Sequence, residues 1–437
     1  MLIICSVFNL LRLLFLFVFC LFIFPFIGAK ATYFFLRFAG PSFIKMGQLL
    51  ANRPDLVGDK LSSILSNLQD QLPSFSFKRV VKIIESEFCC PINQIFSEIS
   101  PIPIAAASIA QVHKSKNLDG DVVAVKVLRP DITRLIKRDI ATLKLSAFLV
   151  GLVSAFLKEK LLDIIDLLDS CSKKELDFLC EASACEQLKE KLLDIDGFYV
   201  PKVYWQLTSK KVLTTEWIDG IAFSNREAIL NSSFDKVQIA RNLVASYFNQ
   251  VYVHGFFHAD MHAGNLFLMK NGNIAVVDFG IMGFIDKKTR IAIVEILIAF
   301  LARNYHKVAQ IHIDIGLIPK NVNIDEFAMS CCVIGELVVD KAVGQVSMAK
   351  LLESLLTMTR KYNMKTKPEL LLLQKTMMLL EGVGVFLDKD LNIWNLARPF
   401  VKEWATKNIG FDAKVRDFIV DAYALFKRLP EILSANK

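Results

Sequence analysis

The stretch that decides the fold is HADMHAGN at residues 258–265, followed by DFG at residues 278–280. Asp260 precedes Asn265 by five positions, and the run NIAVV leads directly into Asp278. Phosphoryl transfer requires one carboxylate that orients the attacking group, and oxygen ligands that hold Mg²⁺ near the phosphates. The sequence therefore predicts Asp260 as the catalytic residue, and Asn265 and Asp278 as metal ligands.

The order and spacing of these residues match the catalytic loop of protein kinases, in which an Asp and an Asn five positions later are followed by Asp-Phe-Gly. Kinases also carry a lysine on a strand ahead of this loop, which contacts the α- and β-phosphates. Here the strand pattern VAVK ends at Lys126, which we predict to be catalytic and nucleotide-binding. Its expected partner is a helical glutamate, and Glu181 is the best candidate, although 181 − 126 = 55 residues is a long separation.

The loop expected to cover the nucleotide contains no glycine. Kinases place a glycine-rich turn ahead of the strand lysine so that backbone amides can approach the phosphates. The equivalent stretch here reads IAAASIAQV, and alanine disfavours positive φ, so we expect a stiffer loop. The predicted nucleotide-binding residues are Ile104, Ala105, Ala106, Ala107, Ser108, Ile109, Ala110, Gln111, Val112, Lys126 and Glu181.

The composition favours work at a membrane surface. Hydrophobic residues make up 53% of the 437 residues, the mean hydropathy is +0.41 and the net charge is +8. A modest basic excess suits an anionic bilayer or phosphate ligands. Nucleic acid is not an expected partner, because the Lys and Arg residues form no dense stripe interleaved with aromatics. The nine cysteines include no C-x-x-C spacing, which argues against a disulfide framework and against zinc.

The N-terminal leader is the candidate membrane anchor. Residues 2–29 are almost all apolar, with Arg12 as the only charged residue, and they are long enough to span a bilayer. The alternative is a helix lying in the membrane interface with Arg12 reaching the surface. Basic residues after the leader, Lys30, Arg37 and Lys45, place the body on the cytoplasmic side. A second apolar run, residues 145–157, is too short to span and is expected to be a buried core helix.

The order of the predicted elements defines the fold class. Short β-branched runs at 102–113, 122–128 and 212–217 predict strands, and residues 132–193 predict a helical insertion among them. From residue 223 onward the pattern is mostly helical. We therefore predict an α+β, two-lobed protein-kinase-like fold with a helical N-terminal extension and a helix-rich C-lobe. The predicted domains are a membrane anchor (1–30), the helical extension (31–90), an N-lobe with the insertion (91–218) and a C-lobe carrying the catalytic loop and DFG (219–437).

Several motifs together resemble the UbiB family of atypical kinases over residues 40–410. These are KMGQ at 45–48 (the family's KxGQ), AAASIAQVH at 105–113, ELD at 175–177 (its ExD), HADMHAGN, DFG, and LLQKT through EGVG at 372–384. The resemblance implies ATP and Mg²⁺ as cofactors, kinase-like or ATPase activity, and a required role in ubiquinone biosynthesis. It also implies a location at the bacterial inner membrane.

The same resemblance assigns a regulatory role to the KxGQ and ExD motifs. It implies that the KxGQ helix folds over the place where a peptide substrate would bind. Lys45 and Gln48 share one helical face at this spacing, from which they could reach Glu175, Asp177 or the nucleotide. The chain departs from the bacterial members at its end, where residues 415–432 form an amphipathic pattern in place of apolar helices.

The segment after DFG argues against a generic protein substrate. Only a few residues separate Gly280 from a helical pattern near Lys288, and no Ala-Pro-Glu motif follows. Membrane lipids and isoprenoid quinone precursors are therefore the expected partners, together with other ubiquinone-biosynthesis enzymes. Two alternatives stay open: a small-molecule phosphotransferase of the aminoglycoside or choline kinase type, and a non-catalytic nucleotide-binding scaffold for quinone biosynthetic enzymes.

Overall fold

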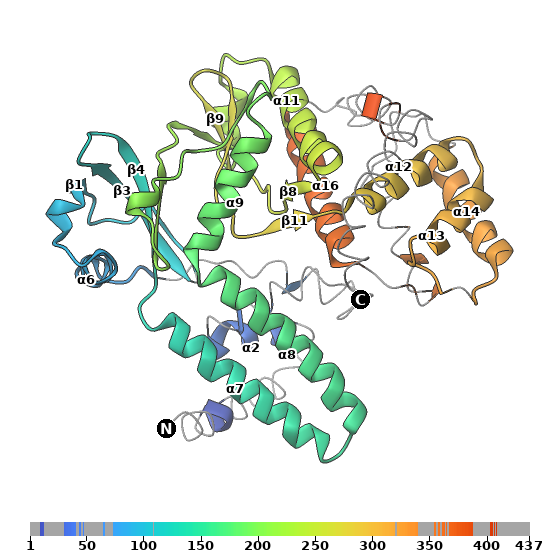
Figure 1. Ribbon diagram of the computed structural model, residues 1–437, viewed down its shortest axis with the longest axis horizontal. Helices are drawn as coiled ribbons and strands as arrows, with labels where there is room; N and C mark the ends of the chain where they lie inside the picture. Colours follow the sequence, from blue (N-terminus) through green and yellow to red (C-terminus); the bar gives the residue numbers. More distant parts are fainter. Residues whose placement is uncertain are drawn as a thin grey trace, which may run out of the picture. The chain divides into compact units, whose positions relative to one another are not determined.

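The structure is a computed structural model that forms two compact units, each described here by itself (Figure 1). The first consists of Met1–Glu190, Tyr199–Gly220 and Ala275–Ile281, and the second of Lys191–Phe198, Ile221–Ile274 and Met282–Lys437. Within them the structure describes residues 9–12, 30–40, 43–44, 47, 64–65, 73–107, 109–319, 321–339, 354, 357–358, 361–362, 364, 367–387, 403–404, 406 and 408.

The first unit combines a small antiparallel sheet with helices. Its helices are α2 (Lys30–Ala39), α6 (Phe77–Phe88), α7 (Ile132–Gly151), α8 (Ala155–Glu175) and α9 (Phe178–Lys191), with 3₁₀ turns η1 (Ile92–Gln94) and η2 (Trp205–Leu207). Its strands are β1 (Phe96–Ile99), β2 (Ala105–Ala106), β3 (Ala110–Asn117), β4 (Val122–Leu128) and β6 (Val212–Glu216). These elements confirm the predicted strands at 122–128 and 212–217 and the predicted helical insertion. The predicted strand at 102–113 was wrong as a single element, because the chain turns there and forms the antiparallel pair of β2 and β3.

The sheet of the first unit separates a hydrophobic core from the face that carries the strand lysine. The strand order is β1-β3-β4-β6, with β2 paired to β3. Along β4 successive side chains point to opposite faces. Val123, Val125 and Val127 are buried in a cluster with Val80 and Ile84 of α6. The alternation therefore places Lys126 on the opposite face of the sheet from α6.

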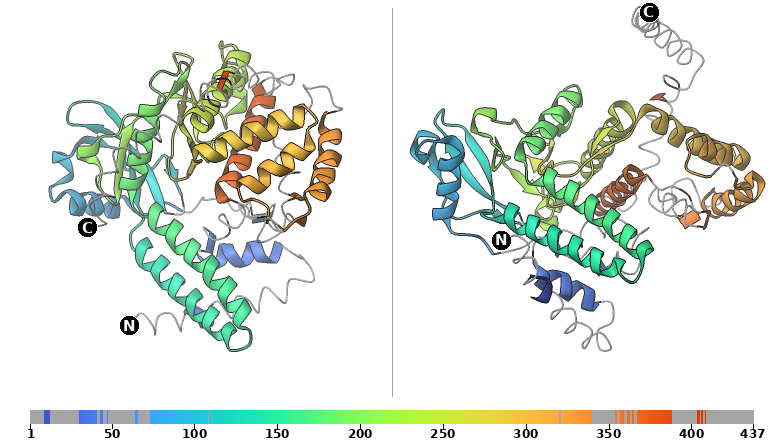
Figure 2. Two further views of the ribbon diagram at one scale, coloured as in Figure 1. Left: turned by 45° about the vertical axis from the view of Figure 1, so that its right-hand side comes forward. Right: turned by 60° about the horizontal axis from the view of Figure 1, so that its bottom comes forward.

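The helical insertion is an antiparallel hairpin. Helices α7 and α8 run side by side and extend away from the sheet of this unit (Figures 1 and 2). Toward the sheet end, buried Ile136 and Ile140 on α7 and Ile165 and Leu168 on α8 supply apolar packing. At the far end the apolar side chains are exposed, namely those of Phe148, Leu149, Leu152, Val153 and Phe156. The expectation that residues 145–157 form a buried core helix was wrong.

The second unit is built mainly of helices. These are α10 (Arg226–Leu230), α11 (Lys236–Phe248), the π-helical segment η3 (Asn249–His254), α12 (Lys287–Leu301), α13 (Tyr305–Asp314), α14 (Ile324–Val339) and α16 (Pro368–Leu387). Strands β8 (Phe256–His258) and β11 (Met282–Phe284) form an antiparallel pair. A further sheet has the order β5-β10-β9-β7, with β5 (Phe198–Tyr199), β7 (Gly220–Ala222), β9 (Leu266–Met269) and β10 (Ile274–Val276).

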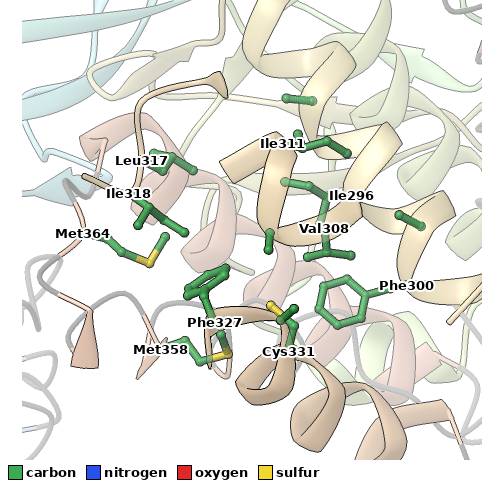
Figure 3. Close-up of a cluster of buried hydrophobic side chains, with 14 residues drawn as sticks. Ile296, Phe300, Val308, Ile311, Leu317, Ile318, Phe327, Cys331, Met358 and Met364 are labelled. Carbon is green, nitrogen blue, oxygen red and sulfur yellow. The ribbon is translucent and has the colours of Figure 1, made fainter. Parts of the chain in front are cut away.

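Two groups of packed helices are seen among the described residues of the second unit. Helices α12, α13 and α14 enclose a cluster of buried side chains that includes Phe300, Val308, Phe327 and Cys331 (Figure 3). The other group consists of α11 and α16, where the Tyr247 hydroxyl approaches the Leu373 carbonyl. Among the helices that the structure describes, α16 is the one long and apolar enough to cross a membrane, but 44% of its most apolar window is buried. We interpret α16 as a core helix of this unit.

Several predicted segments lie outside the described residues. They are most of the leader, Lys45 and Gln48 of the KxGQ motif, Ser108 of the alanine-rich loop, and residues 415–432. Of the leader, only Asn9–Arg12 is described. The Asn9 side chain is buried and donates hydrogen bonds to Asp139 (3.1 Å) and Thr142 (3.2 Å) of α7. The described part of the leader therefore contacts the helical hairpin through Asn9, and the spanning of a membrane by the leader stays a prediction.

Candidate nucleotide and metal site

Lys126 is the centre of the polar cluster in the first unit. Its ammonium donates to both carboxylate oxygens of Glu181, at 2.8 and 3.0 Å, and to Oδ1 of Asp278 at 3.0 Å. It also lies 5.4 Å from the centre of the Phe178 ring. The predicted Lys126–Glu181 ion pair is thus present, and it brings the strand lysine and the DFG aspartate into direct contact.

The charges in this cluster do not balance, because two carboxylates share one ammonium. Burial works to lower the pKa of Lys126, but the charges of Asp278 and Glu181 outweigh it and hold that pKa above its usual range. Burial raises the pKa of Glu181, Lys126 opposes the rise, and the charge of Asp278 adds to it. A cation bound at Asp278 would relieve the repulsion between the two carboxylates.

Asp278 holds a backbone conformation that most residues avoid. Its φ is +65°, in the left-handed region, where aspartate is tolerated better than most non-glycine residues. Its side chain is about half exposed, at 51%. Strained backbone of this kind persists where the surroundings impose it and is concentrated at ligand-binding and switch sites. One carboxylate oxygen contacts Lys126 while the side chain stays half exposed. This exposure leaves the carboxylate accessible to a metal ion.

Asp177 of the ExD motif positions the helix that carries Glu181. Its carboxylate accepts a hydrogen bond from the Leu179 backbone N–H at 3.1 Å, in the manner of a helix N-cap. Glu181 lies in the first turn of that helix, α9. Glu175 is half-buried at the last position of α8. The structure therefore supplies a local structural role for Asp177, and a contact of this motif with the KxGQ residues stays a prediction.

The alanine-rich loop is a tight hairpin held by Arg129. Strand β2 pairs with β3 through Ala105 opposite Val112 and Ala106 opposite Gln111. The Ala107 N–H donates to the Ala110 carbonyl at 2.8 Å. The Arg129 guanidinium donates to the Ala107 carbonyl at 2.8 Å, and the Arg129 backbone N–H donates to the Ile109 carbonyl at 2.7 Å. Cross-links of this kind support the predicted stiffness of the loop.

Gln111 and Val112 point to opposite faces of the sheet. Val112 lies opposite Lys126 in the register, so it shares the face of the charge cluster. Gln111 is buried, donates to the Phe75 carbonyl at 3.2 Å and accepts from the Phe75 N–H at 3.0 Å. Its amide also lies 2.8 Å from His113 Nε2. The Gln111 side chain therefore ties the start of α6 to the sheet, which leaves any nucleotide contact of this residue to its backbone.

The catalytic loop lies in the second unit, and its own hydrogen bonds hold its shape. The Asn265 side-chain nitrogen donates to the Asp260 carbonyl at 3.1 Å, which identifies the other amide atom as the oxygen available for a metal. The His262 N–H donates to the same carbonyl at 2.8 Å, and the Asp260 N–H donates to His258 Nδ1 at 3.2 Å. His258 is fully buried. The loop thus fixes the Asp260 and Asn265 backbones relative to each other.

Lys375 is a site residue that motif reasoning missed. Its ammonium donates to Oδ1 of Asp260 at 2.8 Å, from a position 115 residues further along the chain, on α16. Both side chains are less than a third exposed, so the pair is only partly screened by water. The sequence showed LLQKT as a family motif but gave Lys375 no role. A pairing this distant has no local spacing signal.

Close packing around strand β8, which leads into the catalytic loop, requires glycine at two positions. Gly255 ends the π-helical segment with φ +65°, and a Cβ there would lie 2.4 Å from the Ile285 carbonyl oxygen. At Gly283, on the strand paired with β8, a Cβ would fall 2.1 Å from the Phe257 ring. Both positions exclude a side chain, so the strand that delivers His258 can pack closely against β11. π-Helical segments are themselves enriched at functional sites.

The donor set suits a nucleotide-bound Mg²⁺ better than an all-protein metal cage. In the part of the chain that the structure describes, no three His, Cys, Asp or Glu side chains gather as a metal-ligand group. Mg²⁺ usually takes one or two protein oxygens and completes its shell with water and phosphate oxygens. The Asp278 carboxylate is a ligand of that kind in the first unit, and the Asn265 amide oxygen is chemically suited to the same task.

Comparisons with known proteins show the family of this chain. The ABC1 atypical kinase-like domain matches residues 67–312, and the UbiB helical domain matches residues 331–392. The chain belongs to the UbiB family of atypical kinases. It is 35% identical over 379 residues to the probable protein kinase UbiB of Marinobacter nauticus, covering 85% of this chain and 69% of that protein.

A solved structure shows the same fold at low sequence identity. The complex of Rv3197 with erythromycin from Mycobacterium tuberculosis matches with a TM-score of 0.53 and 22% identity, over 80% of this chain and 90% of that one. The predicted α+β, protein-kinase-like fold is confirmed. Membership of the UbiB family implies ATP use, kinase-like activity and a role in ubiquinone biosynthesis.

Proposed function

We propose that this protein is an atypical kinase or ATPase that uses Mg·ATP at the bacterial inner membrane, with its catalytic body on the cytoplasmic side. It would couple ATP binding and hydrolysis to the handling of isoprenoid quinone intermediates in ubiquinone biosynthesis. The observation that carries the proposal is the contact of Lys126 with both Glu181 and Asp278. A strand lysine held by a helical glutamate beside the DFG aspartate is the arrangement that kinases require for catalysis.

Each residue has a defined task in this chemistry. Lys126, held by Glu181, neutralises charge on the α- and β-phosphates. Asp260 orients the attacking hydroxyl or water, and Lys375 holds the Asp260 carboxylate in place. Asn265 and Asp278 would hold Mg²⁺, which supplies neutralisation of the charge that develops on the phosphate oxygens.

The short segment after DFG supports a lipid-linked role over general protein phosphorylation. Strand β11 (Met282–Phe284) begins two residues after Gly280 and is paired with β8, and α12 begins at Lys287. Asp286 caps α12 by accepting a hydrogen bond from the Thr289 N–H at 2.7 Å. The chain between DFG and α12 is therefore committed to a strand and a cap. It offers little of the extended platform on which protein kinases bind a peptide.

Hydrolysis of ATP by the full-length protein in phospholipid vesicles tests the proposal. Wild-type protein should hydrolyse ATP with Mg²⁺, and faster when a phenolic isoprenoid mimic is present. Asp278→Asn should abolish hydrolysis, whereas the same substitution at exposed Asp194 should leave it unchanged. If Asp278→Asn hydrolyses ATP at the wild-type rate, the catalytic proposal fails and the nucleotide-binding scaffold becomes the better account.

A further inference from the structure

The far end of the α7–α8 hairpin is an apolar cap. We define this hairpin tip as residues 145–157, a run of 13 residues, LSAFLVGLVSAFL, without a charged side chain. It comprises the last turns of α7, the connection at 152–154 and the start of α8. Figures 1 and 2 show the turn at the end of the hairpin that points away from the sheet of the same unit.

The exposure of this cap is large for apolar side chains. Val153 is 93% exposed, Leu152 is 73% exposed and Phe156 is 64% exposed. Phe148 and Leu149, one turn earlier on α7, are also exposed. Single exposed apolar residues are ordinary, but a contiguous group of them marks an interaction surface. The surface is the convex end of a hairpin, because its residues come from both helices and from the turn that joins them.

Charged residues mark where the cap ends. On α7 the first is Lys144, which forms an ion pair with Asp166 of α8 at 2.9 Å. On α8 the first is Lys158, whose ammonium lies 5.4 Å from the centre of the Phe148 ring. A Cβ on Gly151 would lie 2.5 Å from Cδ of Lys158, so the lysine stem passes close along the tip. A lysine that lays its stem on apolar surface and presents its charge at the edge is typical of a membrane interface.

The length of the cap along the helix axis matches the depth of the interfacial region of a bilayer. From Lys144 to Gly151 the helix rises about 10 Å, at 1.5 Å per residue over seven residues. Interfacial helices bury their apolar surfaces by roughly 5–10 Å at the boundary between headgroups and acyl chains. An apolar run of this length is too short to span but suits an interfacial segment.

The leader supplies independent support for lipid as the occupant. Asn9 contacts Asp139 and Thr142 on α7, and the Arg12 guanidinium donates to the Ala39 carbonyl at the end of α2. Residues 13–29, which follow in the sequence, contain no charged residue. Asn9, which precedes this uncharged stretch in the sequence, contacts α7 about 14 Å along the helix from its end (nine residues from Thr142 to Gly151).

We propose that the α7–α8 hairpin tip inserts into the interfacial region of a phospholipid bilayer, in the leaflet that faces the protein. Leu152, Val153 and Phe156 then lie among the upper parts of the acyl chains. Lys158 lies at the level of the phosphates, where its charge complements anionic headgroups. This proposal stands on the hairpin alone and does not depend on the nucleotide chemistry or on the role in ubiquinone biosynthesis.

Site-specific fluorescence tests this insertion in the full-length chain, whatever the leader contributes to binding. An environment-sensitive probe is attached to Val153→Cys, with every native cysteine except the buried Cys185 and Cys331 changed to serine so that labelling is specific. The protein is reconstituted into vesicles of phosphatidylethanolamine and phosphatidylglycerol, with or without brominated acyl chains. Matched probes at Leu118→Cys, an exposed leucine in the β3–β4 turn, and at Lys137→Cys, an exposed position lower on α7, serve as controls.

The expected result is a blue shift of the probe at position 153 and loss of its emission with brominated chains. The probes at 118 and 137 should remain in water and be quenched by iodide. Iodide quenching at position 153 would overturn the proposal, because the tip would then lie in solvent. Protection of that probe from both quenchers would overturn it too, since a second copy of the chain or another protein would cover the tip.

Discussion

Replacing Glu181 with glutamine tests how strongly the lysine is held. The substitution keeps the size of the side chain and removes its charge. Lys126 then loses an ionic partner that meets it at 2.8 and 3.0 Å, and keeps Asp278 at 3.0 Å. The side chains of Lys126 and Glu181 are only 16% and 8% exposed, so solvent screens the pair little. Without Glu181, the lysine would compete more strongly with a metal ion for Asp278.

The size of the effect follows from these contacts. Hydrogen bonds to charged groups contribute about 1.5–3 kcal/mol each when they are lost from a protein interior. If that energy serves to hold Lys126 against the phosphates in the transition state, kcat/KM for ATP should fall by about 10- to 150-fold, at about 1.36 kcal/mol per decade.

Steady-state ATP hydrolysis at varied ATP concentration measures this loss. Glu186→Gln, on the same helix, serves as the matched control, and thermal unfolding shows whether either variant is destabilised. A kcat/KM for Glu181→Gln within twofold of wild type, in protein that is as stable as wild type, would refute the view that Glu181 positions Lys126.

Three further predictions concern other parts of the structure. Lys375→Met should lower kcat for ATP hydrolysis by roughly 10- to 100-fold with little change in the KM for ATP, because the lysine holds Asp260 and not the nucleotide. Lys375→Arg should restore part of the loss. An unchanged kcat in Lys375→Met would contradict this role. Ala106→Gly should change the ratio of ATP to ADP affinity by about two- to fivefold, measured by calorimetry, since glycine adds roughly 0.5–1 kcal/mol of backbone freedom to the hairpin. A ratio equal to that of the wild-type protein would count against a stiff loop. Burial lowers the pKa of His312 in the folded protein below its value near 6.5 in the unfolded chain, so the neutral side chain contributes stability above pH 6.5 that is lost as the pH falls below it. The melting temperature should therefore drop between pH 7 and 5, and this drop should be smaller in His312→Asn.

Local motifs predicted the parts of the site whose geometry is local or shared with kinases. The VAVK pattern placed Lys126 on a buried strand, because alternation along that strand is legible in the sequence. The five-residue spacing of Asp260 and Asn265 places both on one loop, where the Asn265 side chain donates a hydrogen bond to the Asp260 carbonyl. The pairing of Lys126 with Glu181 was predictable only because the order of motifs fixed a kinase-like topology, in which a helix must supply the acidic partner.

Long-range contacts could not be read from the sequence. Nothing near Lys375 indicates that it reaches Asp260, because the pairing depends on how α16 packs against α11. Gln111 stands in a stretch predicted to bind nucleotide, yet the register of β3 turns its side chain toward Phe75. Both outcomes depend on tertiary packing and not on local pattern.

The apolar run at the hairpin tip shows a different limit. Residues 145–157 are apolar enough for a protein core, and composition alone does not distinguish a surface that faces protein from one that faces lipid. Only the packing of α7 against α8 reveals that Leu152 and Val153 extend past Ala147, the last buried residue of α7. The same ambiguity applies to α16, whose apolar length suits a membrane but whose side chains pack in the second unit.

The most direct test of the central claim is the ubiquinone content of a bacterial strain that lacks its own UbiB-family gene and expresses variants of this protein. Wild-type protein and Asp194→Asn should restore ubiquinone, whereas Asp278→Asn, which loses the carboxylate that contacts Lys126, should leave the strain deficient at equal protein level. Full restoration of ubiquinone by Asp278→Asn would contradict the claim that this site drives quinone synthesis with ATP.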